Sequence, residues 1–100
     1  MIEVEYPITK SGTAKVDVLS REPYQAATWA HAGERFLMRI QTRQWWAEFE
    51  FVLDPTLKPM GMQRMVTKLK GKPLNQEELD AAVNAGITAM VNKIRGERKR

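Results

Sequence analysis

Apolar residues occupy every second position from Ile2 to Ile8 and again from Ala14 to Val18, with Lys10–Gly12 between the two runs. A period of two is typical of strands that bury one face. A glycine-containing link between two such runs predicts a β-hairpin. Pro7 lacks a backbone N–H, so the first strand belongs at an edge or at a bulge.

A helix-start signal follows the first hairpin. Ser20 can cap, Glu22 suits the positive end of the helix dipole, and Pro23 is tolerated in a first turn. The next segment contains spaced small residues, which predict a short helix over 24–33 that ends near Gly33: Ala26, Ala27, Ala30 and Ala32.

The clearest alternation covers Arg35–Gln41 and Trp45–Leu53, which predicts a second hairpin. Its loop around Thr42 and Arg43 lacks the glycine that a tight primed turn prefers, so we expect a longer connection. Adjacent residues of a strand point to opposite faces, so one of the two neighbouring tryptophans enters the core while the other faces out.

Two helices are expected after this hairpin. Met62, Met65, Val66 and Leu69 have helical spacing, which predicts a short helix over 62–69. Asn75 and Glu78 resemble a capping box at the start of a longer helix. Gly96 stands just past the expected end of that helix, whose apolar stripe is Leu79, Val83, Ile87, Met90 and Ile94.

These elements predict an α+β fold of order ββ-α-ββ-α-α, an antiparallel sheet of two hairpins with helices packed on one face. The chain has 100 residues, of which 43% are hydrophobic and 28% charged, which is typical of one globular domain. We therefore expect a single domain over residues 1–96 and a basic tail over residues 97–100.

The net charge of +4 is unevenly distributed. Residues 1–57 carry six basic and eight acidic side chains, whereas residues 58–100 carry ten and four. Such clusters are either solvated surface or attract phosphates, acidic proteins or anionic lipid. The candidate anion or nucleic-acid contacts are Lys58, Arg64, Lys68, Lys70, Lys72, Lys93, Arg95, Arg98, Lys99 and Arg100.

The sequence offers few residues of the types that catalysis needs. The chain has no cysteine, which excludes thiolate chemistry and sulfur-ligated metals. Its one imidazole, His31, falls among alanines on a predicted helix, so we interpret it as structural. Ser11 and Ser20 suit turn and capping roles. Because glycine-rich phosphate loops are also absent, we expect no enzyme activity, no catalytic residue, no cofactor and no metal.

The N-terminal segment has neither a basic leader nor an apolar core region, so it does not resemble a signal peptide. No apolar run approaches the roughly 20 residues of a spanning helix. We therefore expect a cytoplasmic protein without membrane contact.

Binding is better supported than catalysis. An outward Trp46 would anchor a protein partner, with Arg39 near enough for a cation–π contact worth roughly 0.5–1 kcal/mol. Glu48 and Glu50 would line the same strand face opposite Arg39 or Arg43. The predicted partner-binding residues are Trp46, Arg39, Arg43, Glu48 and Glu50.

Alternatives to this surface remain open. The C-terminal helix or the methionine-rich segment could cover the face around Trp46. Met60, Met62 and Met65 could fill the core or form an adaptable binding surface. An exposed edge strand could accept a peptide by strand addition, and acidic residues on the first strand favour a monomer.

The order of elements over residues 14–98 resembles HxsD-type proteins, small companions of radical-SAM enzymes that modify ribosomally made peptides. A strand precedes Tyr24, spaced alanines and a hairpin follow, and Met90, Val91 and Asn92 stand where that family tends to have two leucines and an asparagine. The resemblance implies a non-catalytic partner of a modifying enzyme or of its precursor peptide.

The leading prediction is therefore a small protein-binding module that acts as partner or adaptor of a larger enzyme or its peptide substrate. A small phage-type inhibitor of a host enzyme belongs to the same class. A basic nucleic-acid-binding protein is the alternative, ranked lower because the aromatic residues and the cations lie in different segments.

Overall fold

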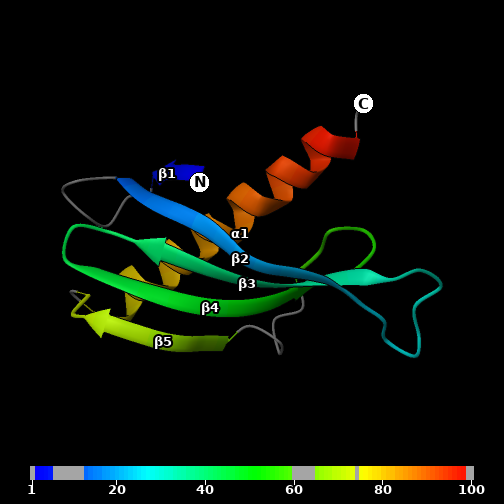
Figure 1. Ribbon diagram of the computed structural model, residues 1–100, viewed down its shortest axis with the longest axis horizontal. Helices are drawn as coiled ribbons and strands as arrows, with labels where there is room; N and C mark the ends of the chain where they lie inside the picture. The colour runs from blue at the N-terminus through cyan, green and yellow to red at the C-terminus, as the bar shows by residue number, and fades with distance from the viewer. Residues whose placement is uncertain (1, 6–12, 60–64, 74, 99–100) are drawn as a thin grey trace.

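The computed structural model describes residues 2–5, 13–59, 65–73 and 75–98, which form a five-stranded sheet and one helix (Figure 1). Each strand pairs antiparallel with the next one in the chain, so the spatial order is β1-β2-β3-β4-β5. The α+β class and the helix on one face of the sheet are confirmed. The elements are β1 (Ile2–Glu5), β2 (Thr13–Tyr24), β3 (Gly33–Gln41), β4 (Trp45–Leu53), β5 (Met65–Gly71) and α1 (Gln76–Arg98).

The core lies between α1 and one face of the sheet, here called the inner face. Every second side chain of a strand points to the same face, so alternate residues of β4 point toward α1 and contribute to the core. Phe51 stacks between Phe36 and Phe49, with ring centroids 5.1 and 5.8 Å away. The inner-face residues of the three central strands are all buried: Ala14, Val16, Phe36, Met38, Ile40, Trp45, Ala47, Phe49, Phe51 and Leu53.

The predicted stripe of the long helix is confirmed, since all five of its residues are buried. Asn75 caps the helix by accepting a hydrogen bond from the backbone N–H of Glu78 at 2.9 Å. The helix does not stop before Gly96 but continues to Arg98. Gly96 therefore lies within α1, and Glu97 and Arg98 belong to its last turn.

Arg21 of β2 links the C-terminal end of α1 to the sheet. Its guanidinium binds Glu34 through two nitrogens, donates to Glu97 of α1 at 3.1 Å, and lies over the ring of Phe36. The hydrogen bond to Glu34 is the main reason that the pKa of Arg21 is raised above its ordinary value. Glu97 is thus part of the fold.

The helix predicted over 24–33 is wrong. β2 runs through Arg21, Glu22 and Pro23 to Tyr24, and all four pair with β3. Residues 25–32, which carry the alanines, form the loop between β2 and β3. A stripe of alanines buries too little apolar area to hold a short helix on the sheet. Pro23 is tolerated because β1 pairs only with Thr13–Val16 of β2, which leaves this part of β2 at an edge.

The helix predicted over 62–69 is also wrong. Met65–Gly71 forms β5, an edge strand whose seven residues are all exposed. Here tertiary pairing with β4 prevails over a weak local stripe that is interrupted by lysines. Met65 is 58% exposed and therefore no core residue. Met60, Met62 and the predicted turn at Lys10–Gly12 lie outside the described residues. The order ββ-α-ββ-α-α is thus replaced by five strands followed by one helix.

Candidate functional site

The face of the sheet opposite α1, here called the outer face, carries most of the predicted partner-binding residues. Trp45 and Trp46 show how β4 builds both faces. Trp45 is 3% exposed in the core, where its indole Nε1 donates to Oε1 of Glu78 at 3.1 Å. Trp46 is on the opposite side and is half-buried. The indole that faces out is therefore Trp46.

Trp46 is framed by polar and basic neighbours. The guanidinium carbon of Arg39 lies 4.5 Å from the centroid of its ring, which confirms the predicted cation–π contact. Gln41 of β3 and Lys70 of β5 are its direct cross-strand partners. Arg39 thus contacts one side of the indole, and Lys70 lies beside it on the neighbouring strand β5.

Glu48 and Glu50, the outer-face carboxylates of β4, are both ion-paired. Arg39 donates to Oε2 of Glu48 at 2.7 Å, and Arg35 donates to Oε2 of Glu50 at 3.0 Å. The side chain of Glu48 is only 8% exposed, so it is not the solvated residue that alternation alone suggests. Pairing neutralises these carboxylates, so they oppose an anionic partner less than their number implies.

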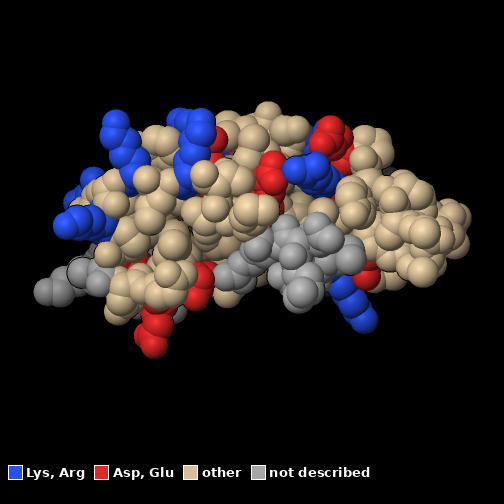
Figure 2. All heavy atoms as spheres, turned by 90° about the horizontal axis from the view of Figure 1, so that it is seen from below, with Lys and Arg blue, Asp and Glu red and all other residues tan. Residues whose placement is uncertain are grey.

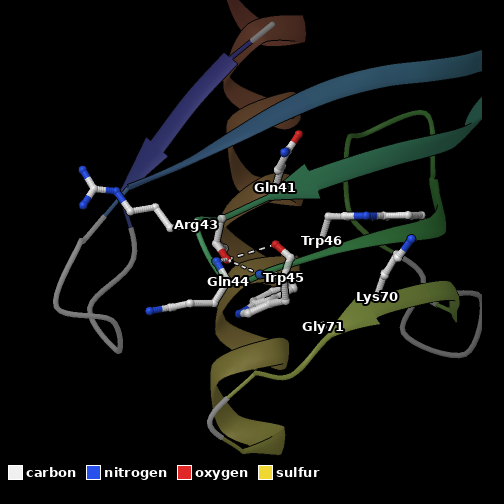
Figure 3. Close-up of a pocket in the computed structure, with 8 residues that line it drawn as sticks. Gln41, Arg43, Gln44, Trp45, Trp46, Lys70 and Gly71 are labelled. Atoms are coloured by element: carbon white, nitrogen blue, oxygen red, sulfur yellow. Dashed lines mark hydrogen bonds between the residues drawn. The ribbon is translucent and has the colours of Figure 1, made fainter.

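A shallow pocket of about 330 Å³ opens beside Trp46, where the β3–β4 hairpin meets the end of β5 (Figure 3). Acidic residues are missing from its lining, which consists of Gln41, Thr42, Arg43, Gln44, Trp45, Trp46, Lys70 and Gly71. In Figure 3, Trp46 and Lys70 project to the same side of the sheet, whereas Arg43 points away from the indole. Arg43 therefore lies at the rim of the site and not beside Glu48 or Glu50.

Thr42 and Gly71 give the pocket its shape. Thr42 Oγ1 accepts hydrogen bonds from the backbone N–H of Gln44 at 3.2 Å and of Trp45 at 3.1 Å, which closes the loop without a glycine. Gly71 has a φ of +87°, and a Cβ there would lie 2.4 Å from the carbonyl oxygen of Gln44. Only glycine lets β5 approach the hairpin so closely.

The basic candidates do not form one surface. Lys68 and Lys70 share the outer face, because they pair with Glu48 and Trp46, and Lys72 is exposed just beyond β5. Lys93 and Arg95 are exposed on α1, which covers the inner face. Near the loop that holds Lys58, Arg98 donates to the carbonyl oxygen of Pro55 at 3.2 Å. Arg64, Lys99 and Arg100 lie outside the described residues.

Sequence reasoning missed that Lys68 and Lys70 lie beside the aromatic strand. The signal was present as the alternation of Lys68, Leu69 and Lys70, but the helical spacing of the methionines concealed it. Aromatic residues and cations are therefore not kept apart by their separation in sequence, because β4 and β5 are hydrogen-bonded neighbours.

His31 is not on a helix. It is exposed in the loop 25–32, and Ser20 is exposed on β2, while Ser11 lies outside the described residues. Across the part of the chain that the structure describes, there is no group of three or more His, Asp or Glu residues placed to hold a metal ion. α1, the one helix of that part, is too polar to cross a membrane.

Comparisons with known proteins place this chain in no group: no family model, no curated protein and no solved structure matches it. The helix with spaced alanines, one of the elements behind the resemblance to HxsD-type proteins, is replaced by the end of β2 and a loop.

Proposed function

We propose that this protein is a non-catalytic binding module that docks on a larger protein through the outer face of its sheet. The observation that carries the proposal is the outward Trp46, which Arg39 holds from one side. α1 packs on the other face, so it does not cover this indole. Aromatic and arginine side chains that are already held in place are the usual anchors of protein interfaces.

The polar setting of Trp46 supports a protein partner. Gln41, Gln44 and Lys70 surround the pocket beside the indole with donors and acceptors that can satisfy a partner's backbone or side chains. The carboxylates of Glu48 and Glu50 already have ion partners within the chain, so burying this face leaves neither charge unpaired.

The class of partner is a larger enzyme or its peptide substrate, as the resemblance to HxsD-type proteins suggests. An inhibitor of an enzyme would use the same surface. Adaptor and inhibitor are distinguished by whether the activity of the captured enzyme depends on this protein or is suppressed by it.

The test is affinity capture from the native host with the tagged full chain and mass spectrometry of the bound proteins. Trp46→Ala removes the anchor. Trp29→Ala is the matched control, because Trp29 is also half-buried but packs against Tyr24 near Gly33, at the opposite end of β3 from Gln41, the partner of Trp46. We expect a stoichiometric protein that binds the wild type and Trp29→Ala but not Trp46→Ala. Capture that is indifferent to Trp46→Ala would refute the proposal.

Nucleic acid is the second candidate, and one observation favours it: Lys70 stands directly opposite Trp46, which places a cation beside an aromatic ring. The position of Lys93 and Arg95 argues against nucleic-acid binding. They lie on α1, on the other side of the sheet from Lys70, so the cations do not form one continuous surface for a phosphate backbone. Nuclease treatment and two salt concentrations in the same capture experiment separate the candidates, since phosphate contacts weaken steeply with salt.

A further inference from the structure

The free edge of β5 is the second binding feature of the molecule. β5 is the last strand of the sheet order, and among the described residues no strand pairs with its outward side. An edge strand directs unpaired backbone N–H and C=O groups outward along that side. All residues of β5 are exposed, so this backbone is accessible to another chain.

The side chains of β5 divide into two sets across the sheet. Lys68 and Lys70 are on the outer face. Val66 and Leu69 are on the inner face, where they stay 38% and 47% exposed at the margin of the core. Thr67 is the extra residue of a bulge, so the regular stretch of the edge is Lys68–Gly71. Over this stretch β5 presents Lys68 and Lys70 on the outer face and Leu69 on the inner face, with Val66 on the inner face just before the bulge.

The charges around the edge differ between its two sides. Figure 2 looks at the molecule from the side of β5, and blue cations gather along the upper left of the view while red carboxylates lie beneath them. A strand added to this edge would meet positive charge on the outer face. An acidic residue is therefore favoured at each outer position of the added strand.

We infer that the free edge of β5 binds an extended segment of the partner protein as a sixth strand, and that this segment alternates acidic and apolar residues. Its acidic side chains lie beside Lys68 and Lys70, and its apolar side chains continue the inner face beside Val66 and Leu69. The inference rests on the proposed function and names the chemistry of the partner. Backbone pairing supplies affinity and the alternation supplies specificity.

A second copy of this chain matches the same edge poorly. Antiparallel pairing of two β5 strands centred on Leu69 would place Lys68 of each copy opposite Lys70 of the other. Like charges directly opposite one another destabilise a sheet. Lysines on an edge strand also guard it against self-association, and the same two charges select an acidic strand.

The test uses the full ¹⁵N-labelled chain and a synthetic octapeptide of alternating glutamate and valine. We expect a saturable titration that shifts the amide signals of Lys68–Gly71 and slows their hydrogen exchange. Lys68→Glu with Lys70→Glu should weaken binding about tenfold or more, because two attractive cross-strand pairs become repulsive. The same variant should bind a peptide of alternating lysine and valine. Lys93→Glu with Arg95→Glu, an equal change of charge on α1, should leave binding unchanged.

A second peptide separates strand addition from simple charge attraction. Methylation of alternate backbone nitrogens keeps every carboxylate but removes the donors of a β-ladder. Equal binding of the methylated peptide would overturn the inference, as would an absence of binding by the parent peptide. If a single-stranded oligonucleotide of the same charge displaces the peptide at a lower concentration, the edge binds nucleic acid instead. If the amide signals of β5 shift with protein concentration alone, the edge binds a second copy of this chain.

Failure of this inference and failure of the proposed function give different results. In the capture experiment the β5 variant is Lys68→Glu alone, because Lys70 also lines the pocket beside Trp46. A partner that is lost with Trp46→Ala but retained with Lys68→Glu supports docking on the outer face and refutes strand addition. If the peptide binds β5 and Trp46→Ala still captures the partner, strand addition is supported and docking through Trp46 is refuted.

Discussion

The indole of Trp45 and the carboxylate of Glu78 meet inside the core, with Nε1 and Oε1 3.1 Å apart although the two residues are 33 positions apart in sequence. Glu78 is 1% exposed, so the bond forms where water cannot replace it. It joins β4 to the first turn of α1 and thereby fixes how the helix begins on the sheet.

Removing this carboxylate should destabilise the fold. Glu78→Ala leaves a buried indole N–H without this acceptor, so we expect the free energy of unfolding to fall by about 1–3 kcal/mol in urea denaturation. Glu77→Ala is the control, because Glu77 is exposed in the same turn and loses only a helix-dipole interaction of about 0.3–1 kcal/mol. Equal losses for both variants would contradict a specific role for the bond.

Gly86 sets the distance between α1 and β4. A Cβ at this position would lie 2.9 Å from Cζ of Phe49, whose side chain is fully buried. Gly86→Ala should therefore destabilise the protein by about 1–3 kcal/mol through overpacking, although alanine is the better helix former. Gly96→Ala tests the same substitution in open space and should stabilise by up to about 1 kcal/mol. A stabilising Gly86→Ala would show that the helix can shift.

Arg39 and Arg35 form a matched pair of outer-face arginines. Arg39→Met leaves the carboxylate of Glu48, 8% exposed, without its ion partner, so we expect a loss of about 1–3 kcal/mol. Arg35→Met leaves Glu50, 26% exposed, where water can take over, and should cost at most about 1 kcal/mol. Thermal and urea denaturation of the two variants measure the difference, and the reverse order would refute this account of burial.

Asp54 makes the stability of the loop after β4 depend on pH. Its Oδ1 accepts hydrogen bonds from the Thr56 hydroxyl and from the backbone N–H groups of Lys58 and Thr56. These bonds, that of the Thr56 hydroxyl first, hold the pKa of Asp54 below its ordinary value of 3.8. Because the pKa is lower in the folded state, the contribution to stability is fully present above the unfolded value and is lost as pH falls through the folded one.

Asp54→Asn should therefore lose stability relative to wild type at neutral pH, and the difference should shrink as the pH falls below about 4. Urea denaturation of both proteins across this range measures it. NMR titration of the Asp54 carboxyl gives the pKa directly, and a midpoint at or above 3.8 would contradict the hydrogen-bonding account.

The hairpin of β3 and β4 and the long helix could be predicted from sequence because each has a strong pattern of its own. Nine residues of alternating aromatic and polar character can bury one face only as a strand. The stripe from Leu79 to Ile94 with Asn75 before it can bury one face only as a capped helix. The contact of Arg39 with Trp46 followed from the register of that hairpin.

The sequence by itself therefore determined the core sheet, the helix and the outward direction of one tryptophan. Tertiary structure decided the conformation of 24–33 and 65–71, whose local spacing favours helices: Tyr24 pairs with Gly33 across the loop 25–32, and 65–71 pairs with β4. A stripe of alanines buries too little apolar area to hold a helix. A weak stripe of methionines cannot match the hydrogen bonds offered by a strand already in place. That pairing also decided the candidate site, because it carries Lys70 to a position beside Trp46 that is 24 residues away along the chain.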